Sequence, residues 1–135
     1  MAIKSILFPE QSRSFPGQRW TNILLRTLHL IGLAGVGGVF FYPVADNSWM
    51  PYFYLAMASG IGLMAISIWS NGVWLVQLRG QSILLKVFLL TLIPPFPEAK
   101  IPLFLAVIII SGLIAHAPGN IRYYSLYHRR RIEML

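Results

Sequence analysis

Cysteine is absent from the 135 residues of this chain, and charged side chains make up only 11% of it. Without cysteine there can be no disulfide framework, no thiolate metal site, no covalent haem attachment through a CxxCH motif and no cysteine nucleophile. Soluble domains carry roughly 25% charged residues. The low charge, together with 56% hydrophobic residues, therefore predicts a chain that resides in a membrane.

Acidic residues are especially scarce, and the four present are Glu10, Asp46, Glu98 and Glu133. All four lie outside the apolar stretches, whereas proton relays and ion-coupled transporters usually depend on carboxylates within the membrane. The sequence also has no phosphate-binding glycine loop, no serine nucleophile elbow and no paired carboxylates. We therefore do not expect an enzyme, and a transporter ranks third among the function classes considered.

Apolar stretches predict four transmembrane helices, at about residues 23–42, 52–74, 83–96 and 101–117. A spanning helix needs roughly 20 mostly apolar residues, so the whole chain is expected to form a single transmembrane domain. The last two stretches are short, and Pro94-Pro95 stops the third because proline lacks an amide donor and clashes with the preceding turn. These two helices are expected to form a tight hairpin, followed by a basic cytoplasmic tail at residues 118–135.

The basic residues indicate the orientation of the chain. If both termini and the turn at Arg79 are cytoplasmic, ten of the eleven Lys and Arg residues lie inside, and Lys100 lies outside with Asp46 and Glu98. Cytoplasmic loops of membrane proteins are enriched in Lys and Arg. The predicted fold is an all-α integral membrane protein, an up-down-up-down bundle of four transmembrane helices with both termini cytoplasmic. Its expected location is the cell inner (plasma) membrane, as a multi-pass protein.

Two histidines stand in or at the end of the predicted membrane helices. His29 lies near the start of the first helix and His116 at the end of the fourth. Since these helices run in opposite directions, both side chains are expected at similar depth near the cytoplasmic side. Gly32 and Gly112 lie one turn nearer the membrane centre and would leave room for a porphyrin edge. This arrangement suits haem b, whose iron takes one imidazole on each side.

The neighbouring arginines complete this hypothesis. Arg26 and Arg122 could hold the haem propionates through charge-assisted hydrogen bonds, and the protein would then pass electrons between a quinone and a partner. The alternative is a haem-free accessory or assembly subunit of a larger membrane complex, in which His29 donates to a neighbouring backbone and His116 meets lipid headgroups. A non-haem metal site is disfavoured, because no third ligand stands at a suitable spacing.

Small residues form a second pattern in the first two predicted helices. Gly32, Gly35 and Gly38 recur at three-residue spacing, and the second helix carries Ala56-x-x-x-Gly60. Small residues at such spacings let helix backbones approach closely in lipid. The pattern predicts that these two helices pack against each other, and a glycine groove of this kind could also receive a porphyrin.

The tail from Arg122 to Arg131 combines basic and aromatic residues, a combination that in soluble proteins can indicate RNA binding. Directly after a membrane helix it more often anchors the chain on anionic lipid, at about 1 kcal/mol per basic residue. Lys86, near the inner end of the third helix, is expected to snorkel to the headgroups. The expected partners are the lipid bilayer and other membrane subunits, and nucleic-acid binding is not expected.

Overall fold

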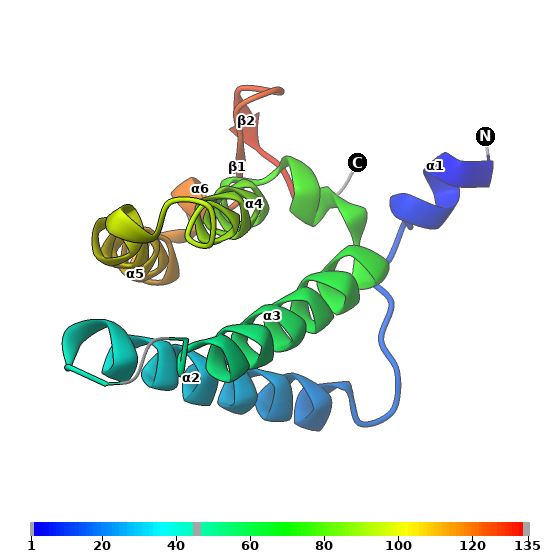
Figure 1. The fold of residues 1–135 in the computed structure, drawn as a ribbon. Helices are drawn as coiled ribbons and strands as arrows, with labels where there is room; N and C mark the ends of the chain where they lie inside the picture. The colour runs from blue at the N-terminus through cyan, green and yellow to red at the C-terminus, as the bar shows by residue number, and fades with distance from the viewer. Residues whose placement is uncertain (1, 45–46, 134–135) are drawn as a thin grey trace. The chain divides into compact units, whose positions relative to one another are not determined.

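The structure is a computed structural model that describes residues 2–44 and 47–133 (Figure 1). It is mostly helical, as the sequence predicts, and a small two-stranded sheet near the C-terminus adds to that class. Asp46, expected in an outer loop, lies outside the described residues. In chain order the elements are α1 (Ala2–Leu7), α2 (Gln18–Phe41), α3 (Met50–Ser70), η1 (Gly72–Val76), α4 (Leu78–Thr91), η2 (Pro97–Ala99), α5 (Lys100–His116), α6 (Gly119–Arg122), β1 (Tyr124–Ser125) and β2 (Arg130–Arg131).

Three helices in the described part of the chain are long and apolar enough to cross a membrane. They are α2, α3 and the stretch Pro97–His116, which consists of η2 and α5 together. At 1.5 Å per residue, the 20 residues of that stretch extend about 30 Å, the thickness of the hydrocarbon core. Helix α4 has 14 residues and extends about 21 Å. Its length alone does not establish a fourth crossing, which therefore stays a prediction.

Polar residues set the limits of the first two long helices. Helix α2 begins at Gln18, before the predicted start at residue 23, and follows Gly17 in the left-handed conformation at φ 82°. Helix α3 ends at Ser70, although the apolar stretch continues to residue 74. The reason is Asn71, whose side chain accepts a hydrogen bond from the Val73 amide at 3.0 Å and so caps the 3-10 helix η1.

The third predicted segment is shifted toward the N-terminus in the structure. Helix α4 begins at Leu78, so Arg79 lies in its first turn instead of in a loop. The helix ends at Thr91, ahead of Pro94-Pro95, as the effect of proline on the preceding turn predicts.

The chain divides into two compact units, which are described separately. Ser14–Ile66 forms the hairpin unit, and Met1–Arg13 with Ser67–Leu135 forms the tail unit. In the hairpin unit α2 and α3 run antiparallel. Near the turn that joins them, the rings of Phe40 and Phe53 pack edge-to-face on Trp49, with centroids 5.4 and 5.3 Å away. This aromatic cluster fixes one end of the helix pair.

Helices α4 and α5 form a hairpin within the tail unit. Its apolar side chains Ile93, Phe104 and Val107 are buried. The Lys86 ammonium donates to the Ser111 hydroxyl at 3.1 Å, and that hydroxyl donates to the Val107 carbonyl at 2.7 Å. Lys86 therefore joins the two helices, a role that the expectation of snorkelling did not include.

The N-terminal residues pack on the end of α3 within the same unit. The Arg13 amide donates to the Ser70 carbonyl at 2.8 Å, and the Ser70 hydroxyl donates to the Arg13 carbonyl at 2.6 Å. The Arg13 guanidinium donates to the carbonyls of Ser5, at 3.2 Å, and Ile6 in the last turn of α1. Carbonyls in the last helical turn have no partner inside the helix, so Arg13 caps α1.

The C-terminal tail is folded where the sequence indicates only a basic extension. Strands β1 and β2 pair antiparallel, and Tyr124 lies opposite Arg131 in the register. The Ile132 amide donates to the Tyr123 carbonyl at 2.9 Å, which extends this pairing. Arg129 adopts a positive φ of 51° in the turn between the strands. The small hairpin thus folds back toward the start of the tail.

Candidate functional site

His29 lies half-buried on the face of α2 that meets α3. Its Nδ1 is 2.7 Å from the carbonyl oxygen of Ala56 and 3.4 Å from the Ser59 hydroxyl. A carbonyl oxygen can only accept, so Nδ1 carries the ring proton and donates it to Ala56. The expected alternative role of His29, donation to a neighbouring backbone, is therefore confirmed at this nitrogen.

This hydrogen bond also fixes the tautomer of the ring. With the proton on Nδ1, the Nε2 nitrogen of His29 keeps its lone pair. Metal-binding histidines commonly have this second hydrogen bond, in which the ring N–H is donated to a backbone carbonyl and the other nitrogen binds the metal. The contact to Ala56 is thus compatible with a packing role and with a ligand role.

Of the three glycines predicted to pack, Gly32 is the one whose added Cβ would meet the backbone of α3. A Cβ atom at Gly32 would lie 2.6 Å from the Ala56 amide nitrogen and 2.7 Å from the Tyr52 carbonyl oxygen. A Cβ at Gly35 would overlap the Tyr52 side chain, whereas a Cβ at Gly38 would meet nothing within 4 Å. The predicted glycine packing is confirmed at Gly32 and Gly35 and is wrong at Gly38.

Of the remaining predicted haem residues, Arg26 belongs to the hairpin unit, and His116, Gly112 and Arg122 belong to the tail unit. Arg26 is exposed on α2, one turn before His29. In the tail unit His116 is exposed in the last turn of α5, and Gly112, one turn earlier, has open space where a Cβ would be. Arg122 ends α6 and lies beside Tyr123.

Three arginines converge on one aromatic ring at the end of the α4–α5 hairpin. The guanidinium carbons of Arg79, Arg131 and Arg122 lie 4.8, 5.3 and 5.7 Å from the centroid of the Tyr123 ring. Cations within about 6 Å of an aromatic centroid are attracted by the ring quadrupole. Together with Glu133, which pairs with Arg131, these residues form what we call the arginine cluster.

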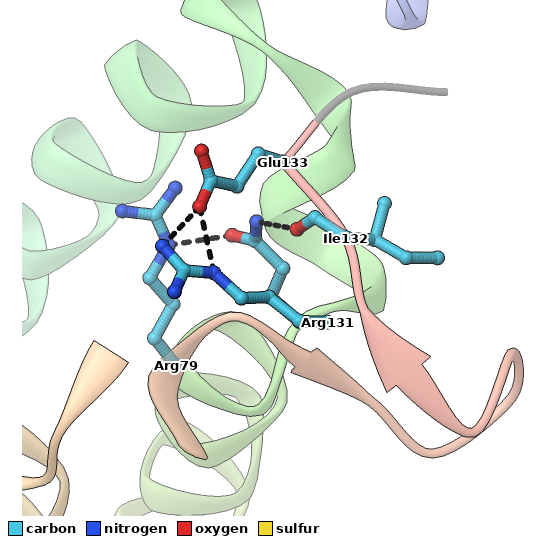
Figure 2. Close-up of polar contacts among 5 residues, drawn as sticks. Arg79, Arg131, Ile132 and Glu133 are labelled. Atoms are coloured by element: carbon cyan, nitrogen blue, oxygen red, sulfur yellow. Dashed lines mark hydrogen bonds and ion pairs between the residues drawn. The ribbon is translucent and has the colours of Figure 1, made fainter. Parts of the chain in front are cut away.

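Gln77 connects the start of α4 to Ile132, the residue that follows strand β2. Its side chain is 1% exposed. Its amide nitrogen donates to the Ile132 carbonyl at 2.6 Å, and its amide oxygen accepts from the Nε of Arg79, also at 2.6 Å. Figure 2 shows Arg79 and Arg131 reaching the same region, where Glu133 accepts from Arg131. Gln77 thereby positions Arg79 within the arginine cluster.

The arginine cluster is electrostatically unbalanced. Arg79 lies in the first turn of α4 and is partly buried beside Tyr123 and Arg122. An arginine stays charged at neutral pH. Among the described residues, Glu133 is the carboxylate that pairs with this cluster, through Arg131, and the Nε of Arg122 is buried without a hydrogen-bond acceptor.

Sequence reasoning missed most of this cluster. It selected Arg122, but for a haem propionate, and it treated Arg79 as a loop residue that reports orientation. Gln77, a buried amide, had no role assigned, and Tyr123 was considered only as one of the aromatic residues of the lipid-anchoring tail. One signal was present, since the tail interleaves arginine with tyrosine.

Within the described residues, no group of three or more His, Cys, Asp or Glu side chains could hold a metal ion.

Comparisons with known proteins identify no relative from which a function could be taken. No protein-family model matches the chain, and searches of curated proteins and of solved structures gave no significant match.

Proposed function

We propose that the protein is a small multi-pass membrane subunit without an active site of its own, which supports the assembly of a larger membrane complex. The observation that carries this proposal is the use of polar side chains in the long helices and in the α4–α5 hairpin. They make hydrogen bonds inside the protein, and such bonds hold membrane helices together.

The individual contacts follow one pattern. His29 donates to the Ala56 carbonyl across the α2–α3 contact, and Lys86 donates to Ser111 across the α4–α5 contact. Ser59 differs, because it donates to the Leu55 carbonyl of its own helix at 2.6 Å and so satisfies its hydroxyl without linking two helices. A catalytic or transport site would need such groups directed at a substrate or ion path. Here they support helix packing instead.

We also propose four membrane segments, with both termini on the cytoplasmic side of the cell inner membrane. The first support is the ten-to-one distribution of Lys and Arg. The second is that Arg79, at the start of α4, lies against Tyr123 of the tail, as expected if α4 and α5 cross as a hairpin. Although α4 is short, a bilayer can thin locally around a short segment.

A second candidate is a b-type haem protein that transfers electrons between a quinone and a partner subunit. One observation favours it, namely the fixed tautomer of His29, which leaves Nε2 available to iron. His29 and His116 would hold the iron, while Arg26 and Arg122 would hold the propionates. The haem would supply one-electron transfer, and the chain would set its position and potential.

Absorption spectroscopy separates the two candidates. Protein purified from haem-replete cells should show no Soret band if it is an accessory subunit. A sharp low-spin α band after dithionite reduction, lost in both His29→Ala and His116→Ala, would establish the haem protein instead. A variant of an exposed neighbour, Leu30→Ala, controls for general disturbance, since Leu30 is exposed beside His29.

Assembly is tested on the full chain at its natural expression level. After mild detergent extraction, the tagged protein should migrate on a native gel well above the position of the 15.2 kDa chain in its micelle. Gly35→Leu, which would force the Tyr52 side chain out of place, should reduce that larger species. Migration of the natural chain only as a free monomer would contradict the accessory role.

A further inference from the structure

The arginine cluster holds more positive charge than its own residues neutralise. Arg79 comes from α4, Arg122 from α6 and Arg131 from β2, and all three lie within 6 Å of the Tyr123 centroid. Among the described residues, Glu133 is the acid that pairs with the cluster, through Arg131. Like charges repel at short range, particularly where burial removes water. A bound anion would relieve this repulsion.

The cluster also has a buried donor that needs an acceptor. The Nε of Arg122 is buried and has no hydrogen-bond partner among the described residues. Leaving a buried donor unpaired is destabilising, and more so where the group is charged. Guanidinium groups bind phosphate oxygens through paired, charge-assisted hydrogen bonds. A phosphate group would therefore meet both needs of the cluster.

The position of the cluster selects the source of that phosphate. The start of α4 and the end of α5 lie at one end of their hairpin, and the cluster lies at the same end. The stretch Pro97–His116 is long enough to cross a bilayer, which places residues just after His116 at the level of the lipid headgroups. Basic groups at the cytoplasmic ends of membrane helices bind anionic headgroups.

We propose that Arg79, Arg122 and Arg131, gathered around Tyr123, bind the phosphate group of an anionic phospholipid. Tyr123 stabilises the three guanidinium groups through its ring, and Gln77 holds Arg79 in place. The bound lipid links α4 to the C-terminal strand hairpin. This site is independent of whether the protein binds haem, because it is built entirely from residues of the tail unit.

The test uses the full-length chain in nanodiscs of phosphatidylcholine, with or without a minor fraction of phosphatidylglycerol. Native mass spectrometry measures the preference for retained phosphatidylglycerol, and thermal unfolding measures its stabilising effect. Arg122→Gln and Arg131→Gln should each weaken this preference by more than about fivefold, the loss expected for any one basic residue near a lipid surface. Glu133→Gln, which removes the competing carboxylate, should strengthen it.

Arg130→Gln is the matched control, because it removes the same charge from an exposed position in β2. It should weaken the preference by no more than this general factor of about fivefold. An equal loss in Arg130→Gln and Arg122→Gln would overturn the proposal by showing only a general attraction of the tail. If inorganic phosphate in phosphatidylcholine nanodiscs reproduces the stabilisation, the lipid is excluded as the source. Unfolding in pure phosphatidylcholine checks that each variant folds, and the largely exposed Arg131 gives a test that does not depend on a buried side chain.

Discussion

Gly32→Ala is the most informative single substitution in the hairpin unit. The added Cβ would lie 2.6 Å from the Ala56 amide nitrogen and 2.7 Å from the Tyr52 carbonyl oxygen. Both are backbone atoms of α3, so neither can rotate away as a side-chain terminus could. Helices α2 and α3 would have to move apart.

The size of the effect follows from these distances. Ordinary contact begins at 3.4 Å, so the helices must separate locally by about 0.8 Å. A gap of 0.5–1 Å already loses roughly a quarter to a half of each dispersion contact around it. The same movement lengthens the bond from His29 to Ala56, now 2.7 Å. Overpacking of this kind costs about 1–3 kcal/mol of the free energy of unfolding.

Gly38→Ala on the same helix is the control. A Cβ at Gly38 would meet nothing within 4 Å, and alanine is more favourable than glycine inside a helix by roughly 0.5–1 kcal/mol. Gly38→Ala should therefore be neutral or stabilising, while Gly32→Ala lowers the free energy of unfolding measured in mixed micelles. Equal stability of the two variants would refute the close backbone contact at Gly32.

Two further predictions concern the tail unit. Gln77→Leu leaves the Ile132 carbonyl and Arg79 without their partner. It should therefore lower the free energy of unfolding by about 1–3 kcal/mol and speed trypsin cleavage of the tail. Unchanged cleavage would show that Gln77 does not hold the tail. Lys86→Met should change the unfolding free energy by less than about 1 kcal/mol, since hydrogen bonds such as that to Ser111 average about 0.6 kcal/mol between membrane helices. A loss of several kcal/mol in micelles would contradict that value.

The sequence predicts the helices well because their cause is local. Long apolar stretches with no water to satisfy the backbone must form helices, and proline at Pro94-Pro95 ends α4 within a few residues. The contact at Gly32 and Gly35 was also predictable, because small residues at helical spacing permit close approach. The failure at Gly38 shows that the spacing alone does not determine where the contact ends.

The arginine cluster could not be predicted because its contacts join residues far apart in the sequence. Gln77 and Ile132 are 55 residues apart, and a buried glutamine has no sequence pattern of its own. The fold of the tail is similarly hidden. Ser125, in a segment of basic and aromatic residues, is 0% exposed, and its hydroxyl interacts with His128 inside the strand hairpin.

The number of membrane crossings is tested most directly by labelling single cysteines in this cysteine-free chain. Glu98→Cys lies in the exposed turn before α5, and Tyr127→Cys lies at the tip of the tail, where Tyr127 is 84% exposed. With four crossings and a cytoplasmic N-terminus, an impermeant thiol reagent added to intact cells should label position 98 and should not label position 127. If only α2, α3 and α5 cross, the pattern reverses, and labelling of position 127 from outside would contradict the account.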